Sequence, residues 1–137
     1  MINKIISAIC TALYNEFGYE VYKERIEQGL EEPCFFVQSI NPSNVPTITG
    51  RRRKEYQYSI TFFPERKKPY EAINSTVERL YKILEVITVD GVKIRGKDVT
   101  TAVTDDVLTF VITYDFFEVS PGDDESMSDY DIKQRGE

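Results

Sequence analysis

The sequence predicts an α+β fold in which a mainly antiparallel sheet carries two amphipathic helices on one face. Two segments repeat apolar residues every three or four positions, which is the helical pattern. Several others alternate apolar and polar residues with a period of two, as half-buried strands do. Strands and helices do not alternate regularly, so a doubly wound parallel sheet is not expected. The 137 residues fit a single domain.

The first segment is a helix that should cover the sheet. Its apolar residues follow the spacing i, i+3, i+4, i+7, at Ile2, Ile5, Ile6, Ile9, Leu13 and Phe17. Gly18 directly follows and suits the left-handed conformation that commonly ends a helix.

Two strands and a long loop are predicted next. Residues 19–27 alternate weakly and carry charges, which favours an exposed or edge strand. Residues 34–40 are apolar enough for a central strand. Two prolines and small polar residues then break the pattern, so residues 41–54 are interpreted as a loop between strands.

The middle of the chain predicts a strand and the second helix. In residues 55–63, Tyr56, Tyr58, Ile60 and Phe62 share one face. Pro69 suits a first helical turn, and a helix of about 15 residues follows from the apolar spacing.

Two hairpins complete the predicted sheet. Asp90-Gly91 is a strong tight-turn signal within residues 86–95. Residues 99–119 read as two strands joined by a turn at 104–107. The second of these strands has the clearest alternation in the chain and should lie at the centre of the sheet.

The last 18 residues differ from the rest. Residues 120–137 hold six acids and two bases, a net charge of −4, whereas the remaining body carries −2. The chain is therefore divided into an α+β domain, 1–119, and an acidic tail, 120–137, which is expected to be disordered in isolation.

Signals for catalysis and cofactors are missing from the sequence. There is no His, the commonest general base, and no nucleotide-binding or hydrolase motif. Cys10 and Cys34 are expected to be buried thiols, and two Cys without His do not make a zinc site. No signal peptide or apolar run long enough to span a membrane is seen. We therefore expect a cytosolic protein that is not an enzyme and binds no metal or cofactor.

One dense basic cluster, Arg51, Arg52, Arg53 and Lys54, ends the predicted loop. Three interpretations remain open: a solvated loop end, a docking surface for an acidic protein partner, or contact with nucleic-acid phosphates. A large number of aromatic residues on strands also indicates self-association or a partner.

An ordered set of segments resembles the tail terminator family of tailed bacteriophages and prophages. The segments are MINKIISAICTALYNEFG, QGLEEPCFFV with the Asn-Pro loop, YSITFFP, RLYKILEVI and VDGVKIRGKD…VTDDVLTFVITYDFF. The chain is most similar to the small version in contractile-tail prophage clusters of Gram-positive bacteria. The similarity spans residues 1–119 and leaves the acidic tail outside.

The resemblance implies a structural role in virion assembly. Such proteins form a hexameric ring at the head-proximal end of the tail tube, stop polymerisation of the tube and sheath, and join the tail to the head connector. Expected partners are other copies of the chain, the tail tube protein, the tail sheath protein and the head-tail connector. DNA passes through the ring without specific binding. The protein is expected in the host cytoplasm during assembly and then in the virion or a phage-tail-like particle.

The resemblance transfers no catalytic residues, but it directs attention to candidate interface residues. The basic loop is expected to face the tube or a neighbouring copy, and the aromatic end of the last strand is expected to face the ring interface. The candidates are Thr47, Arg51, Arg52, Arg53, Lys54, Tyr114, Phe116 and Phe117. The alternative function is a small nucleic-acid-binding or adaptor domain that uses basic residues 51–54.

Overall fold

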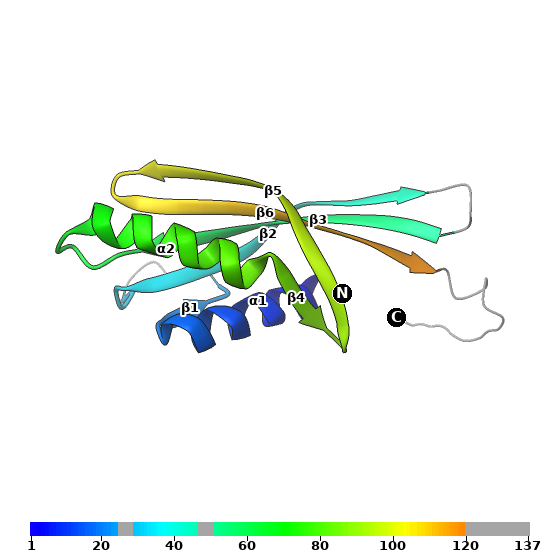
Figure 1. The fold of residues 1–137 in the computed structure, drawn as a ribbon, viewed down its shortest axis with the longest axis horizontal. Coiled ribbons are helices and arrows are strands. Elements are labelled where there is room, and N and C mark those ends of the chain that lie inside the picture. Colours follow the sequence, from blue (N-terminus) through cyan, green and yellow to red (C-terminus); the bar gives the residue numbers. More distant parts are fainter. Residues whose placement is uncertain (25–28, 47–50, 120–137) are drawn as a thin grey trace.

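The computed structural model describes residues 1–24, 29–46 and 51–119, and it confirms the α+β class. In these ranges the chain forms two helices and a six-stranded sheet (Figure 1). The elements are α1 (Ile2–Phe17), β1 (Glu20–Tyr22), β2 (Cys34–Pro46), β3 (Arg51–Phe63), α2 (Pro69–Leu84), β4 (Val86–Val89), β5 (Val92–Thr104) and β6 (Val107–Val119).

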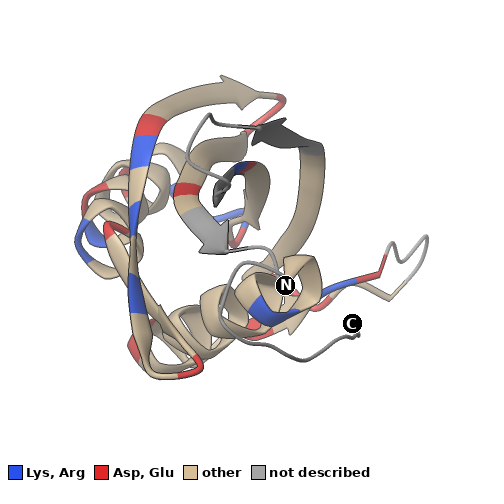
Figure 2. Cartoon of the chain, turned by 90° about the vertical axis from the view of Figure 1, so that its right-hand side faces the viewer, with Lys and Arg blue, Asp and Glu red and all other residues tan. Residues whose placement is uncertain are grey.

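The sheet has the order β1-β2-β3-β6-β5-β4 and is mostly antiparallel. Only the β1–β2 pair, among the described strands, is parallel. As predicted, β6 lies in the middle of the sheet, between β3 and β5. Viewed along the long axis of the molecule, the strands turn through a wide arc and do not lie in a plane (Figure 2). This curl follows from the right-handed twist that accumulates across neighbouring strands.

Both helices pack on the same face of the sheet, as the sequence predicts. On α1, Ile5, Ile9 and Leu13 are completely buried. They join one core with the apolar residues of α2 and the inward faces of β2 to β6. Gly18 ends α1 with φ 73°, and its N–H donates to the Tyr14 carbonyl at 2.8 Å. The left-handed cap predicted for this glycine is therefore confirmed.

Two tyrosine hydroxyls tie the helices to the central strands. Tyr58 on β3 donates to the Ile2 carbonyl at 3.1 Å. Tyr114 on β6 donates to the Leu84 carbonyl at 2.7 Å. Leu84 is the last residue of α2, where carbonyls have no helical partner. The Tyr114 bond thus satisfies a backbone acceptor, and each of the two bonds fixes one helix end against the sheet.

Both predicted hairpin turns are confirmed. Asp90 and Gly91 join β4 to β5, with φ 51° and 79°. Asp105 and Asp106 join β5 to β6, with φ 53° and 62°. Positive φ at both central residues is the turn geometry that matches the twist of paired strands. The sequence pattern predicts two separate hairpins. In the structure, β5 is one continuous strand that belongs to both.

The long loop predicted at residues 41–54 is wrong for the part that the structure describes. β2 continues to Pro46 and β3 begins at Arg51, so a long hairpin replaces most of the loop. Pro42 falls where the register shifts between Ile40 and Ser43, and Pro46 is the last residue of β2. β1 pairs only with the start of β2, so this part of β2 is an edge strand. Prolines are tolerated at bulges and edges because no ladder N–H is required there.

The first predicted strand is shorter than expected. Within residues 19–24, only Glu20–Tyr22 forms a strand, and it does lie at the sheet edge. The remainder of that prediction, residues 25–28, lies outside the described residues.

Candidate assembly surface

Three strands extend past the helices and form a projecting arm (Figure 1). The arm consists of residues 41–46 of β2, 51–55 of β3 and 115–119 of β6. Its register runs from Glu55 opposite Asp115 to Arg51 opposite Val119. Neither flanking strand follows: β1 stops opposite Phe36, and β5 last pairs with β6 at Gly96 opposite Tyr114. Both edges of the arm are therefore unpaired among the described strands, and open edges are templates for pairing with another chain.

A network of four charged side chains lies at the base of the arm, and we call it the charge network: Arg53, Glu55, Lys97 and Asp115. Arg53 Nη1 lies 2.7 Å from Glu55 Oε2 and 3.2 Å from Asp115 Oδ2. Lys97 Nζ lies 2.9 Å from Asp115 Oδ2 and 3.4 Å from Glu55 Oε2. Each cation therefore contacts both carboxylates, across β3, β6 and β5.

The charge network resolves a conflict that the strand register creates. Glu55 and Asp115 are directly opposite each other, and like charges in that position repel. The two cations remove the repulsion. Glu55 and Asp115, in turn, raise the pKa of Arg53, mainly through the charge of Glu55, and the pKa of Lys97, mainly through the hydrogen bond from Lys97 to Asp115. The network lies on the sheet face opposite the helices, because Tyr56 and Tyr114, next to its members along the strands, are buried on the helix side.

The structure separates the predicted basic cluster into parts. Arg51 to Lys54 lie on β3 and not in a loop. Arg53 is occupied by two carboxylates of its own chain, while Lys54 is paired opposite Phe116. Arg51 and Arg52 have described backbone positions, opposite Val119 and Glu118, but their side chains are not described. Thr47 lies outside the described residues.

The three aromatic residues predicted to form an interface also differ in their surroundings. Tyr114 is completely buried by its own chain, so its expected place on an interface is corrected: it is a core residue that supports α2. Phe116 is half-buried, and its ring meets that of Tyr56 edge-on, with centroids 5.5 Å apart. Phe117 is paired opposite Arg53 in the arm, with no description of its side chain.

The two thiols have no feature of an activated nucleophile. Cys34 is buried, and desolvation, with smaller effects of Glu32 and Glu20, raises its pKa to about 11. Cys10 is half-buried, and desolvation also raises its pKa. Nucleophilic cysteines need the opposite shift. Among the described residues no group of three His, Cys, Asp or Glu side chains is placed to hold a metal ion. In the same part of the chain, neither helix has the length and apolar character needed to cross a bilayer.

Two features of the surface were not predicted from the sequence. The charge network joins strands that are 62 residues apart at Arg53 and Asp115, and only the register brings them together. A groove between α1 and the edge strand β4 is lined by small side chains that read as ordinary helix surface. The one usable signal was the charged residues on apolar strands, at Glu55 and Asp115.

A comparison with protein families identifies the family to which the chain is similar. A family model described as phage tail terminator protein matches residues 4–126. No curated protein matches the chain.

Proposed function

Because the chain belongs to the phage tail terminator family, a family of structural tail proteins, we propose that it forms a ring that ends the tail tube. In this proposal six copies assemble at the head-proximal end of the tube and stop polymerisation of the tube and, in a contractile tail, of the sheath. The face of the ring that is directed away from the tube then joins the head connector. We also propose that the protein is encoded by a prophage and that the tail it caps is contractile.

The projecting arm is the observation that carries this proposal. A closed ring needs a head-to-tail interface, in which two different surfaces of one subunit meet. The arm offers one such surface, with an open strand edge on each side among the described strands. The edge strand β4, at the other end of the strand order, offers a different one. We assign the arm, with Arg51, Arg52 and Phe117, to contacts with the tube or the neighbouring copy.

The charge distribution favours a ring through which DNA slides. The body of the chain is close to neutral, so it has no general field that would hold a polyanion. The alternative of a nucleic-acid-binding domain is less well supported, because Arg53 already faces two carboxylates. A phosphate would have to compete with both for the guanidinium.

Tail length is the primary test. Particles made without this protein should carry tubes of abnormal length or tails without heads, as seen by negative-stain electron microscopy, and the wild-type chain supplied in trans should restore them. Normal, joined tails in its absence would refute the proposed function. Native mass spectrometry of the purified chain and of isolated tail ends gives the number of copies, and a number other than six would correct the stoichiometry alone.

A pair of matched charge reversals tests the arm. The variant Arg51→Glu/Arg52→Glu should lower the yield of joined tails at least tenfold while the circular dichroism spectrum stays unchanged. It spares Arg53, whose ion pairs belong to the fold. The control Arg66→Glu/Lys67→Glu makes the same charge change at exposed positions of the β3–α2 connection. Equal yields from both variants would remove the arm from the interface.

A further inference from the structure

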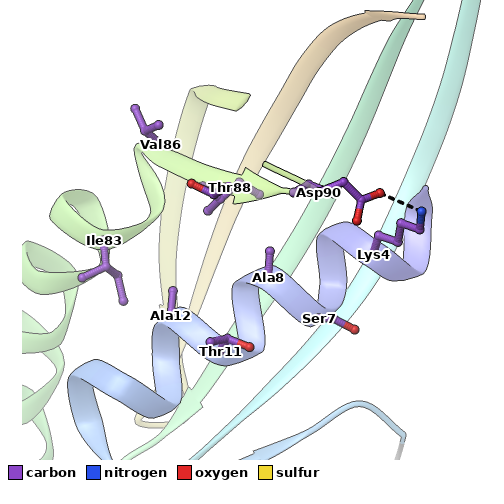
Figure 3. A pocket seen from close by; sticks show the side chains of 11 residues that line it. Lys4, Ser7, Ala8, Thr11, Ala12, Ile83, Val86, Thr88 and Asp90 are labelled. Atoms are coloured by element: carbon purple, nitrogen blue, oxygen red, sulfur yellow. Dashed lines mark hydrogen bonds and ion pairs between the residues drawn. The ribbon is translucent and has the colours of Figure 1, made fainter. Parts of the chain in front are cut away.

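An open groove of about 470 Å³ runs between α1 and β4 (Figure 3). The α1 side is made by small side chains, Ser7, Ala8, Thr11 and Ala12. In Figure 3 the two alanines point from the helix toward the strand. One end is closed by an ion pair in which Lys4 Nζ lies 2.7 Å from Asp90 Oδ2. The groove therefore has small side chains of α1 on one side, the edge of β4 on the other, and one closed end.

That strand edge has backbone groups available for pairing. β4 is the terminal strand of the described sheet and pairs only with β5. The two-residue turn makes Val89 and Ile87 the residues whose backbone groups face β5, and Gly96 N–H continues the pattern by donating to Glu85 O at 2.7 Å. The N–H and C=O groups of Val86 and Thr88 consequently point away from β5. An extended segment can bind such an edge by adding a strand.

The two sides of β4 differ in chemistry. Ile87 and Val89 are buried toward α1, whereas Val86 and Thr88 are exposed on the other side. An added strand would thus need apolar side chains toward α1. On the exposed side it would come near Lys93 and Arg95 of β5, which lie opposite Thr88 and Val86. Both are exposed, and Arg95 has a single described ion pair, with Glu85 at 3.3 Å.

The chain itself contains a segment of this pattern. In residues 128–133, Tyr130 and Ile132 alternate with Asp129 and Asp131. A strand would therefore place Tyr130 and Ile132 on one face and the two acids on the other, where Lys133 follows them at the end of the segment. The family match ends at residue 126, so this segment lies beyond the part that the chain shares with the family model.

We propose that residues 128–133 of one copy bind along β4 of a second copy as an added strand. Tyr130 and Ile132 enter the groove over the small side chains of α1, and the two acids face Lys93 and Arg95. A second copy is the source because β6 ends at Val119, at the tip of the arm and away from the helices of its own subunit (Figure 1). Eight residues, 120–127, separate Val119 from Ser128, and the nine steps along the chain span up to about 30 Å. The inference rests on the proposed ring for the presence of a neighbouring copy.

The site is tested by peptide binding. The acceptor is the full-length variant Tyr130→Ser/Ile132→Ser, and the probe is a fluorescein-labelled peptide of residues 126–137, followed by fluorescence anisotropy. Saturable binding is expected. It should weaken at least tenfold when the acceptor also carries Thr11→Glu, which adds bulk and negative charge in the groove. It should not change with Ser75→Glu, the same change at an exposed position of α2 outside the groove. No binding, or equal effects of the two variants, would overturn the site.

The source of the segment is tested by cross-linking. Benzoylphenylalanine replaces Tyr130 in the full-length chain, and ¹⁴N- and ¹⁵N-labelled copies are mixed before irradiation. Cross-links from residue 130 to the peptide that contains Thr11 should join light to heavy copies. Cross-links confined to single copies would show that each tail binds its own groove and would overturn the second-copy assignment.

Failure here is distinguishable from failure of the proposed function. Peptide binding and cross-linking use the purified chain, whereas ring function is measured on tails. Peptide that does not bind, together with abnormal tails in the absence of the protein, refutes the added strand and leaves the ring in place.

Discussion

Replacing Tyr114 with Phe isolates the hydrogen bond that holds the end of α2. The substitution removes one hydroxyl and keeps the ring, so the packing of the core is nearly unchanged. What is lost is a 2.7 Å bond to the Leu84 carbonyl, at a site where Tyr114 is completely buried. The carbonyl is then left without its partner at the end of the helix. Leaving a buried acceptor unsatisfied costs about 1–3 kcal/mol.

The expected loss can be ranked within the same protein. Tyr58→Phe removes a longer bond, 3.1 Å, to the carbonyl of Ile2, a half-buried residue, and should cost less. Tyr14→Phe removes a hydroxyl from a side chain that is 62% exposed and should change the free energy of unfolding by less than about 0.5 kcal/mol. Urea unfolding followed by circular dichroism measures all three. For a domain of this size, 1 kcal/mol also corresponds to roughly 3–5 °C in Tm.

The predicted order of destabilisation is Tyr114→Phe, then Tyr58→Phe, then Tyr14→Phe. If Tyr114→Phe is no more destabilising than Tyr14→Phe, the hydroxyl does not hold the helix end and the helix–sheet connection described above is wrong. Equal slopes of the unfolding curves are required for the comparison, because a changed slope indicates a changed unfolded or native ensemble.

Three further perturbations follow from the sheet. Gly96→Ala should destabilise by about 1–3 kcal/mol in urea unfolding, because a Cβ there would lie 2.5 Å from Ile112 Cδ1; an unchanged midpoint would contradict this close approach. Burial raises the pKa of Tyr58 and of Tyr114, so their protonated forms favour the folded state. Stability should be full below about pH 10 and fall as the pH rises further, with these tyrosines ionising only on unfolding in an absorbance titration; complete titration of the folded protein near pH 10 would contradict it. Asp115→Asn leaves two cations of the charge network with one carboxylate and should cost about 1 kcal/mol at low salt and less at high salt, whereas a loss independent of salt would mean that packing is responsible.

Local patterns in the sequence predicted most of the fold. Both helices, the cap at Gly18 and the turns at Asp90-Gly91 and Asp105-Asp106 follow from spacing and from residues that tolerate positive φ. These features depend on neighbours within a few positions, which the sequence displays directly.

The errors arise where distant strands decide the outcome. Pro42 and Pro46 indicated a loop, but they lie at a register shift and at a strand end on an open edge, where the missing N–H groups are not needed. The basic residues Arg53 and Lys54 were grouped by adjacency. In a strand, adjacent residues point to opposite faces, so Arg53 meets Asp115 while Lys54 does not belong to the charge network. Register across 62 residues cannot be read from local spacing.

The central pairing of β3 with β6 also has a consequence for synthesis and folding. Between these strands the chain must produce α2 and the β4–β5 hairpin. The pair at the end of their register, Phe62 opposite Leu108, therefore forms only after a long intervening segment has been made. Pairing of segments distant in sequence slows folding, because the ends of a large loop must be brought together first. Until β6 leaves the ribosome, one edge of β3 has no partner from its own chain. The arm is thus completed last, because its third strand, in β6, is made after the rest of the described domain.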